Sequence, residues 1–158
     1  MAEPAIVHTD AILRVLTSRN VQVNVWSNAP TVEQIRIFGR SGMSLARRNP
    51  RGAGLLNLML KGTPSFSEEV RDETVKLMKQ GAFRLGTAHV VLLGGLTGSA
   101  VRAFMSTVML LARSPAPNKV FGEAEPAAAW LAPLLAQGAE AWSVVELVEL
   151  AKLSIARA

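Results

Sequence analysis

The chain has 158 residues and no cysteine, a formal net charge of +5, 49% hydrophobic residues and a mean hydropathy of +0.26. The length is that of one domain with a single core, and the lack of cysteine excludes disulfides, thiolate zinc sites and a cysteine nucleophile. The start, MAEPAIVHTD, shows no secretory signal, so we expect a cytoplasmic protein. The surplus of apolar residues favours a subunit interface and therefore a homo-oligomer.

The positive charge gathers in one region of the chain. Five arginines lie along and just after one predicted helix, where the helix dipole favours cations: Arg36, Arg40, Arg47, Arg48 and Arg51. No aromatic residue interleaves with them, as a stacking surface for single-stranded nucleic acid requires. We expect no nucleic-acid partner, and nucleic-acid binding stays a minor alternative. The most apolar run, residues 103–112, is too short to cross a bilayer, so we expect no membrane span.

The first elements of the chain are predicted strands. Valines alternate with other residues in VQVNVW (Val21–Trp26), the period-two pattern of a half-buried strand. Residues 12–15 are the expected hairpin partner, with residues 18–20 as the turn, and residues 5–8 add a short strand before them. The chain should therefore open with an antiparallel hairpin.

The first helix is predicted from Thr31, which forms a capping-box pattern with Gln34, to about Arg48. Gly39 and Gly42 weaken this helix by about 1 kcal/mol each relative to alanine. We expect that these glycines are present because they allow close packing against a strand.

Strands and helices then alternate to the end of the chain. LLNLML (residues 55–60) is a continuous apolar run, typical of a strand covered on both faces. The elements expected after it are a helix at about 67–78, a strand at 89–93, a helix after Gly94-Gly95, a strand at 119–121, a helix with Pro126 at its first position, and a final helix at 140–157.

This order predicts an α/β fold with a mixed, mostly parallel sheet, an N-terminal hairpin and flanking helices. Residues 1–137 should form one domain. Residues 138–158 should form an amphipathic helix, packed on that domain or at a subunit interface.

Two stretches carry a family resemblance. KVFGEAEPAAAWL (Lys119–Leu131) looks like the short strand and Ala-Trp-Leu helix that end many STAS-like proteins, the group of the bacterial anti-anti-sigma factors. SEEVRDETVKLM (Ser67–Met78) is similar to their middle helix, and SEC14-type lipid-carrier domains have a related architecture. The resemblance, which spans about residues 5–135, implies regulation through protein contacts. Residues 60–67 lack the Asp-Ser start of the family's phosphorylated sequence, so we carry over no phosphosite.

Two serines precede a predicted helix and are candidate site residues. Ser65 and Ser67 are each placed to cap that helix, with Glu68 and Glu69 in its first turn. The alternative is a phosphate or bound anion at the helix N-terminus, with Arg71 one turn beyond Ser67. The two glutamates would repel such an anion, so capping is the favoured interpretation.

The loop Gly94–Ser99 between a strand and a helix is a second candidate. Backbone N–H groups of such a loop could hold an anion, but its spacing matches no phosphate-binding motif, and glycine also serves to turn the chain. The candidate anion-binding or partner-binding residues here are Gly95, Thr97, Gly98, Ser99 and Arg102. If both loops lie at one edge of the sheet, Arg71 and Arg102 could converge on one anionic group.

Catalytic patterns are weak in this sequence. His8 and His89 are the only histidines, and neither has a second ligand at the spacing of a helical metal site. His89 heads an apolar strand and is expected in the core or at its edge, and no serine has the G-x-S-x-G pattern. We therefore expect no metal, no cofactor and no enzyme activity, with a site assembled across subunits as the weakest alternative.

The final helix is the best sequence indication of a partner. Its candidate interface residues are Trp142, Val145, Val148 and Ile155. The favoured interpretation is that this helix covers the domain's own sheet or helices, and an interface with another subunit or protein is the alternative. Taken together, the sequence predicts a non-catalytic, regulatory, self-associating protein-interaction domain of STAS-like type whose partner it does not identify. A small-ligand or lipid carrier of SEC14-like architecture, binding an anionic or apolar molecule near residues 94–99, is the alternative.

Overall fold

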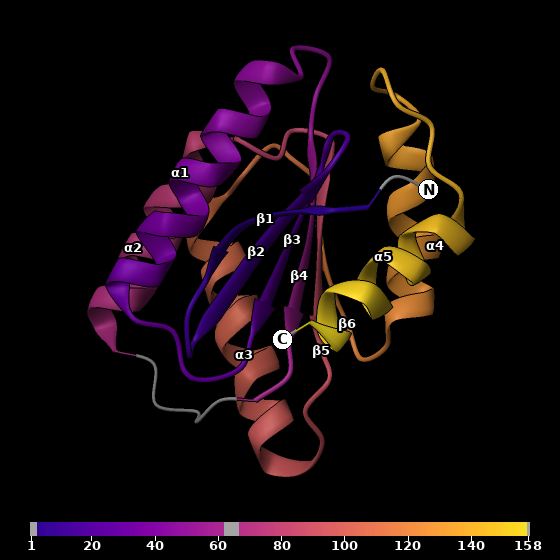
Figure 1. The fold of residues 1–158 in the computed structure, drawn as a ribbon. Helices are drawn as coiled ribbons and strands as arrows, with labels where there is room; N and C mark the ends of the chain where they lie inside the picture. The colour runs from indigo at the N-terminus through magenta and orange to yellow at the C-terminus, as the bar shows by residue number, and fades with distance from the viewer. Residues whose placement is uncertain (1–2, 62–66, 158) are drawn as a thin grey trace.

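The computed structural model describes residues 3–61 and 67–157, which form one sheet with helices on both faces (Figure 1). The strands are β1 (Ala5–Thr9), β2 (Leu13–Ser18), β3 (Val21–Trp26), β4 (Gly54–Met59), β5 (Gly86–Val91) and β6 (Asn118–Phe121). The helices are α1 (Val32–Arg48), α2 (Glu68–Gln80), α3 (Gly95–Ala112), α4 (Ala124–Leu135) and α5 (Val144–Ala156).

The strands lie in the sheet in the order in which they occur in the chain. β1, β2 and β3 are antiparallel, and β3 to β6 are parallel to one another. The predicted α/β fold with a mixed, mostly parallel sheet and an N-terminal hairpin is therefore confirmed. Each parallel pair is joined through one helix, because parallel neighbours require a crossover connection.

The helices form one layer on each side of the sheet. Figure 1 shows α1, α2 and α3 on one face and α4 and α5 on the other. Because successive side chains of a strand point to opposite faces, β3, β4 and β5 contribute to two separate apolar clusters. One cluster contains α4 and α5, and the other contains α1, α2 and α3.

Three details of the helix and strand ends differ from the sequence prediction. The strand predicted at 89–93 is β5, which begins at Gly86. The sequence pattern misses its start because Thr87 and His89 interrupt the apolar residues on one face. The Thr31 hydroxyl bonds the side chain of Gln34 and does not cap the backbone of α1.

The final helix begins later than residue 140. Ser143 accepts a hydrogen bond from the backbone N–H of Glu146, and the Glu146 carboxylate accepts one from the N–H of Ser143. This capping box fixes the start of α5 at Val144, because it satisfies N–H groups that the first helical turn leaves free.

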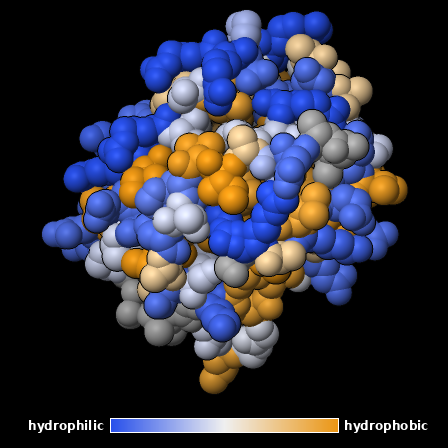
Figure 2. Space-filling view, in the orientation of Figure 1, coloured by the Kyte–Doolittle hydropathy of each residue, from blue (hydrophilic) through white to orange (hydrophobic). Residues whose placement is uncertain are grey.

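α3 is an 18-residue helix with a mean hydropathy of 1.3, of which 28% is buried. Length and composition alone would allow it to cross a bilayer, but it also joins β5 to β6 and packs Val101, Met105 and Val108 inward. Leu96 at its start is 90% exposed. Figure 2 shows hydrophobic side chains at the bottom of the view, where α3 lies in Figure 1. The absence of a membrane span stays a prediction.

Candidate functional site: a cavity between the sheet and three helices

Ser67 is a helix cap. Its Oγ accepts a hydrogen bond from the backbone N–H of Val70 at 3.1 Å, which confirms the capping prediction for this serine. Arg71 lies 3.4 Å from the carboxylate of Glu68 and 3.1 Å from that of Asp72, so its charge is matched within α2. Ser65 lies outside the described residues.

The Gly94–Ser99 loop is shaped by backbone contacts. Gly95 starts α3 with a positive φ of 63°, which favours glycine. A Cβ on Gly98 would lie 2.1 Å from the carbonyl oxygen of Leu93, so no other residue fits there without movement of the backbone. Both glycines therefore have a conformational role, whereas Thr97 is half-buried and Ser99 is exposed.

The two candidate arginines are positioned separately. Arg71 pairs with carboxylates of its own helix, and the Arg102 guanidinium lies beside Gly98, with Nη1 3.6 Å from where a Cβ of that glycine would be. Within the part of the chain that the structure describes, no hydrogen bond or ion pair connects the two loops through them. The shared anion site stays a prediction.

The candidate interface residues around α5 have different environments. Trp142 is 5% exposed, donates from Nε1 to Asn20 Oδ1 at 2.9 Å and lies under the guanidinium of Arg19, 3.6 Å from the ring centroid. Val148 and Ile155 are partly buried against the α4–α5 cluster, and Val145 is 71% exposed. Packing within this chain therefore accounts for Trp142, and Val145 is the candidate that faces outward.

His8 and Asp10 form an exposed pair at the turn after β1, with His8 Nε2 2.7 Å from Asp10 Oδ2. Burial raises the pKa of Asp10, but hydrogen bonds from His8, Leu13 and Ile12 outweigh it and hold this pKa well below its usual range. The carboxylate accepts two backbone N–H groups and so shapes the turn. Among residues 3–61 and 67–157, no three His, Cys, Asp or Glu side chains are grouped as a metal site.

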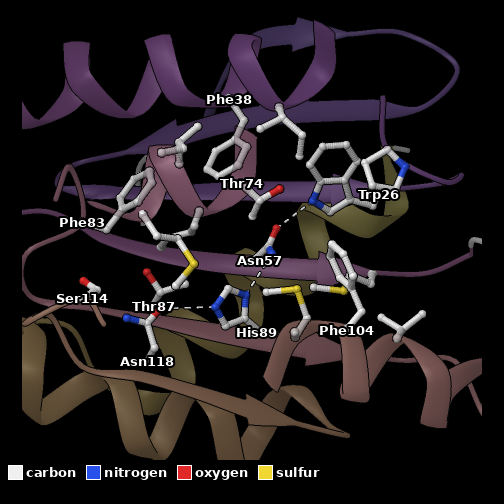
Figure 3. A pocket seen from close by; sticks show the side chains of 18 of the residues that line it. Trp26, Phe38, Asn57, Thr74, Phe83, Thr87, His89, Phe104, Ser114 and Asn118 are labelled. Carbon is white, nitrogen blue, oxygen red and sulfur yellow. Dashed lines mark hydrogen bonds between the residues drawn. The ribbon is translucent and has the colours of Figure 1, made fainter. Parts of the chain in front are cut away.

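A cavity lies between the sheet and helices α1, α2 and α3 (Figure 3). The centre of a water molecule can occupy about 70 Å³ of it. The empty space between the lining atoms, including the part open to solvent, is about 880 Å³. Most of its wall is apolar, and Lys61 is the only charged side chain among the described residues that line it.

Four polar side chains form a hydrogen-bonded chain across the floor of this cavity. Trp26 Nε1 donates to Asn57 Oδ1 at 2.8 Å, and Asn57 Nδ2 is 3.0 Å from His89 Nδ1. His89 Nε2 is 3.3 Å from Asn118 Oδ1, and Asn118 Nδ2 donates to the carbonyl oxygen of Ala116 at 2.8 Å. The chain runs from β3 to β6, because in-register strands place these side chains on one face.

The two ends of this polar chain fix its direction. The Trp26 N–H can only donate and the Ala116 carbonyl can only accept, so each group between them must accept from one side and donate to the other. His89 is therefore the neutral tautomer with its proton on Nε2. Burial lowers the pKa of His89 from 6.5 to about 4, although its hydrogen bond with Asn118 raises it. The imidazole stays uncharged near neutral pH.

Two threonines line the cavity in different hydrogen-bonding states. The Thr74 hydroxyl donates to the carbonyl oxygen of Val70, one helical turn earlier, at 2.7 Å. The Thr87 hydroxyl has no hydrogen-bond partner among the described residues, although Thr87 is only 6% exposed. Thr87 therefore presents an unused donor and acceptor to the cavity.

The sequence predicts that His89 lies in the core or at its edge, but it does not predict this cavity. Its signal was a polar residue inside each apolar strand: Asn57 in LLNLML, and Thr87 and His89 in GTAHVV. Buried polar side chains are rare without partners, so their recurrence on two neighbouring strands indicates a shared polar floor.

Comparisons with family profiles, with curated proteins and with solved structures found no match to this chain.

Proposed function

We propose that this chain binds a small, mostly apolar molecule in the cavity beneath α1, α2 and α3, and that it is a non-catalytic carrier or receptor for that molecule. The position of this cavity agrees with the alternative predicted from the sequence, a carrier that binds its ligand near residues 94–99. Leu93 and Val101, which flank the Gly94–Ser99 loop, line the cavity. The molecule would lie against the ordered polar chain on the floor.

The observation that carries this proposal is the combination of empty space and ordered polar groups in one place. Protein interiors are close-packed, and a void deprives its lining of dispersion contacts. Buried amide and imidazole groups add a desolvation cost. An apolar cavity with a few fixed polar groups is typical of small-molecule sites. Ligand binding therefore explains both the empty space and the buried polar groups.

His89 supports binding over catalysis. A general base must accept a proton near neutral pH. The pKa of His89 is about 4, and both of its ring nitrogens already take part in hydrogen bonds, so this imidazole is poorly suited to accept one. Protonation at Nδ1 would also place two donors, His89 and the Asn57 amide, against each other. We therefore assign His89 an orienting role.

Native mass spectrometry of the protein purified from its own organism tests the proposal. We expect an additional bound mass that organic extraction removes. Ala82→Leu, which adds a larger side chain to the cavity wall, should reduce the bound fraction. Ala129→Leu, on the exposed surface of α4, is the matched control and should retain it. A protein free of bound mass that also gains no ligand from a lipid or metabolite extract would overturn the proposal.

A second candidate function, the protein-interaction role of STAS-like domains, is supported by a basic groove between α1 and α2. Its cationic residues are Arg36, Arg40, Arg47 and Lys76, and its only described acid, Glu73, is paired with Arg36 at 3.2 Å. The excess of cations favours an acidic segment of a partner protein, since opposite charges steer association. None of the described residues that line this exposed groove is aromatic, so they offer no platform on which nucleic-acid bases could stack.

A fluorescent heptaglutamate peptide tests this second candidate. Binding should weaken steeply as salt rises and fall in the double variant Arg40→Ala, Arg47→Ala, because exposed charges are screened. Lys152→Ala, on α5 at the other face, should bind as the wild type does. Equal binding by the double variant, or tighter binding of a single-stranded oligonucleotide than of the peptide, would reject the acidic-segment assignment.

A further inference from the structure

The end of the cavity near β5 and β6 has hydrogen-bond donors that no described residue uses. We call the side chains of Thr87, His89, Ser114 and Asn118 its polar end (Figure 3). The Thr87 hydroxyl is unpaired within the described part of the chain, and the Ser114 oxygen accepts from the N–H of Ala116 at 3.2 Å, which leaves its proton unassigned. Asn118 uses one of its two amide protons for the Ala116 carbonyl.

The nitrogen acceptor of His89 and the amide oxygen of Asn118 both already accept a hydrogen bond at this end. His89 Nδ1 accepts from the Asn57 amide, and Asn118 Oδ1 accepts from the His89 ring. The tautomer of His89 therefore leaves no ring lone pair facing the cavity. The remaining amide proton of Asn118 can only donate, and the hydroxyls of Thr87 and Ser114 can donate as well. An acceptor on the ligand can therefore bond to each of these groups, whereas a donor can bond only to the hydroxyl oxygens.

No cation lies at the polar end among the described residues. Of those that line the cavity, Lys61 is the only charged one, and it lies six residues beyond Leu55, the strand neighbour of Thr87. At the rise of a strand this separation is roughly 20 Å, too far for the lysine side chain to reach. An ionised carboxylate buried at the polar end would have no partner, and such burial is strongly unfavourable.

We propose that the ligand carries a neutral carbonyl oxygen, as in a ketone, ester or amide, that accepts a hydrogen bond from the Thr87 hydroxyl, while its apolar body lies against side chains such as Phe38, Leu77 and Phe83. This inference rests on the proposed function, since it assigns the chemistry of the molecule in the same cavity. Thr87 determines specificity for the carbonyl, and the hydrogen-bonded chain from Trp26 to Asn118 forms the floor beneath the ligand.

Two probes of one shape separate the carbonyl from the apolar body. Acetophenone has a carbonyl oxygen where α-methylstyrene has a CH₂ group, and both are small aromatic molecules. Dissociation constants come from NMR titration of the backbone amides of β4 and β5. The wild type should bind acetophenone about three- to tenfold more tightly than α-methylstyrene, the range of one neutral hydrogen bond.

Three variants assign the preference to one hydroxyl. Thr87→Val has nearly the same shape without the hydroxyl and should lower acetophenone affinity about three- to tenfold while leaving that for α-methylstyrene unchanged. Thr87→Ser keeps the hydroxyl and should retain the preference. Thr74→Val is the matched control, because its hydroxyl lines the same cavity but is already bonded to Val70.

The outcomes distinguish this inference from the proposed function. If both probes bind with shifts in β4 and β5 but the wild type shows no preference, or Thr87→Val keeps it, the carbonyl assignment is overturned and ligand binding stands. If neither probe shifts these amides at millimolar concentration, the proposed function and this inference fail together.

Discussion

The two faces of the sheet use the same strands in different ways. Toward α4 and α5, the central strands present only apolar side chains: Val21, Val23, Val25, Leu56, Leu58, Ala88 and Val90. Toward α1, α2 and α3, the residues between them include Asn24, Asn57, Thr87 and His89, and the last three line a cavity. We call these the packed face and the cavity face.

This difference shows how one alternating pattern can serve stability and binding at once. Each strand residue on the packed face adds burial that stabilises the fold, whereas its neighbours on the cavity face leave space and polar groups. The packed face can therefore support a cavity face that is poorly packed for stability but suited to a ligand. Four predictions test this division.

Removal of α5 should have the largest effect, because this helix covers the packed face. A chain ending at Gln137 lacks three large buried side chains, Trp142, Leu147 and Leu150. At about 2 kcal/mol for each, their loss approaches the whole stability of a small domain. Urea unfolding followed by circular dichroism should show no cooperative transition. If this shorter chain unfolds cooperatively with an unchanged midpoint, residues 1–137 are a domain by themselves.

Substitution of two neighbouring leucines on β4, one on each face, compares how much the two faces contribute to stability. Leu56→Ala on the packed face should lower the free energy of unfolding by about 3 kcal/mol. Leu55→Ala on the cavity face should lower it by roughly 1 kcal/mol less, since part of the Leu55 surface already borders empty space. Chemical denaturation of both variants measures the difference, and equal losses would contradict the division.

His89 should make stability depend on pH. Its pKa is about 4 when folded and 6.5 when exposed, so the unfolded chain binds more protons between these values and stability falls as pH falls. From pH 7 to pH 5 we expect a loss of about 2 kcal/mol. His89→Gln should flatten the unfolding free energy over this range. The same slope in this variant would show that another group is responsible.

Substitution of Arg14 should have the smallest effect on stability. Arg14 is a charged residue among the apolar side chains of the packed face. It lies opposite Val25, and its Nε and Nη1 atoms are buried with no partner in the described part of the chain. Arg14→Met should raise the free energy of unfolding by about 1 kcal/mol, because a buried unpaired polar group is removed. Arg36→Met, at an exposed ion pair with Glu73, is the control and should change stability by less than about 0.5 kcal/mol.

The sequence predicts the fold better than it predicts the site, for physical reasons. The run at 55–60 and the alternation in Val21–Trp26 record how strands are buried, and this pattern is local. The cavity arises where Asn57, Thr87 and Asn118 meet across three strands, and the register that brings them together is not a local property. Ser67 could be interpreted from sequence because a cap involves residues three apart.

The bond between Trp142 and Asn20 joins residues 122 positions apart. During synthesis the chain grows from its N-terminus, so the hairpin that contains Asn20 leaves the ribosome long before Trp142 and α5 exist. Until then the valines of β3 are not covered by α5. We expect nascent chains to recruit chaperones through this stretch until α5 has left the ribosome.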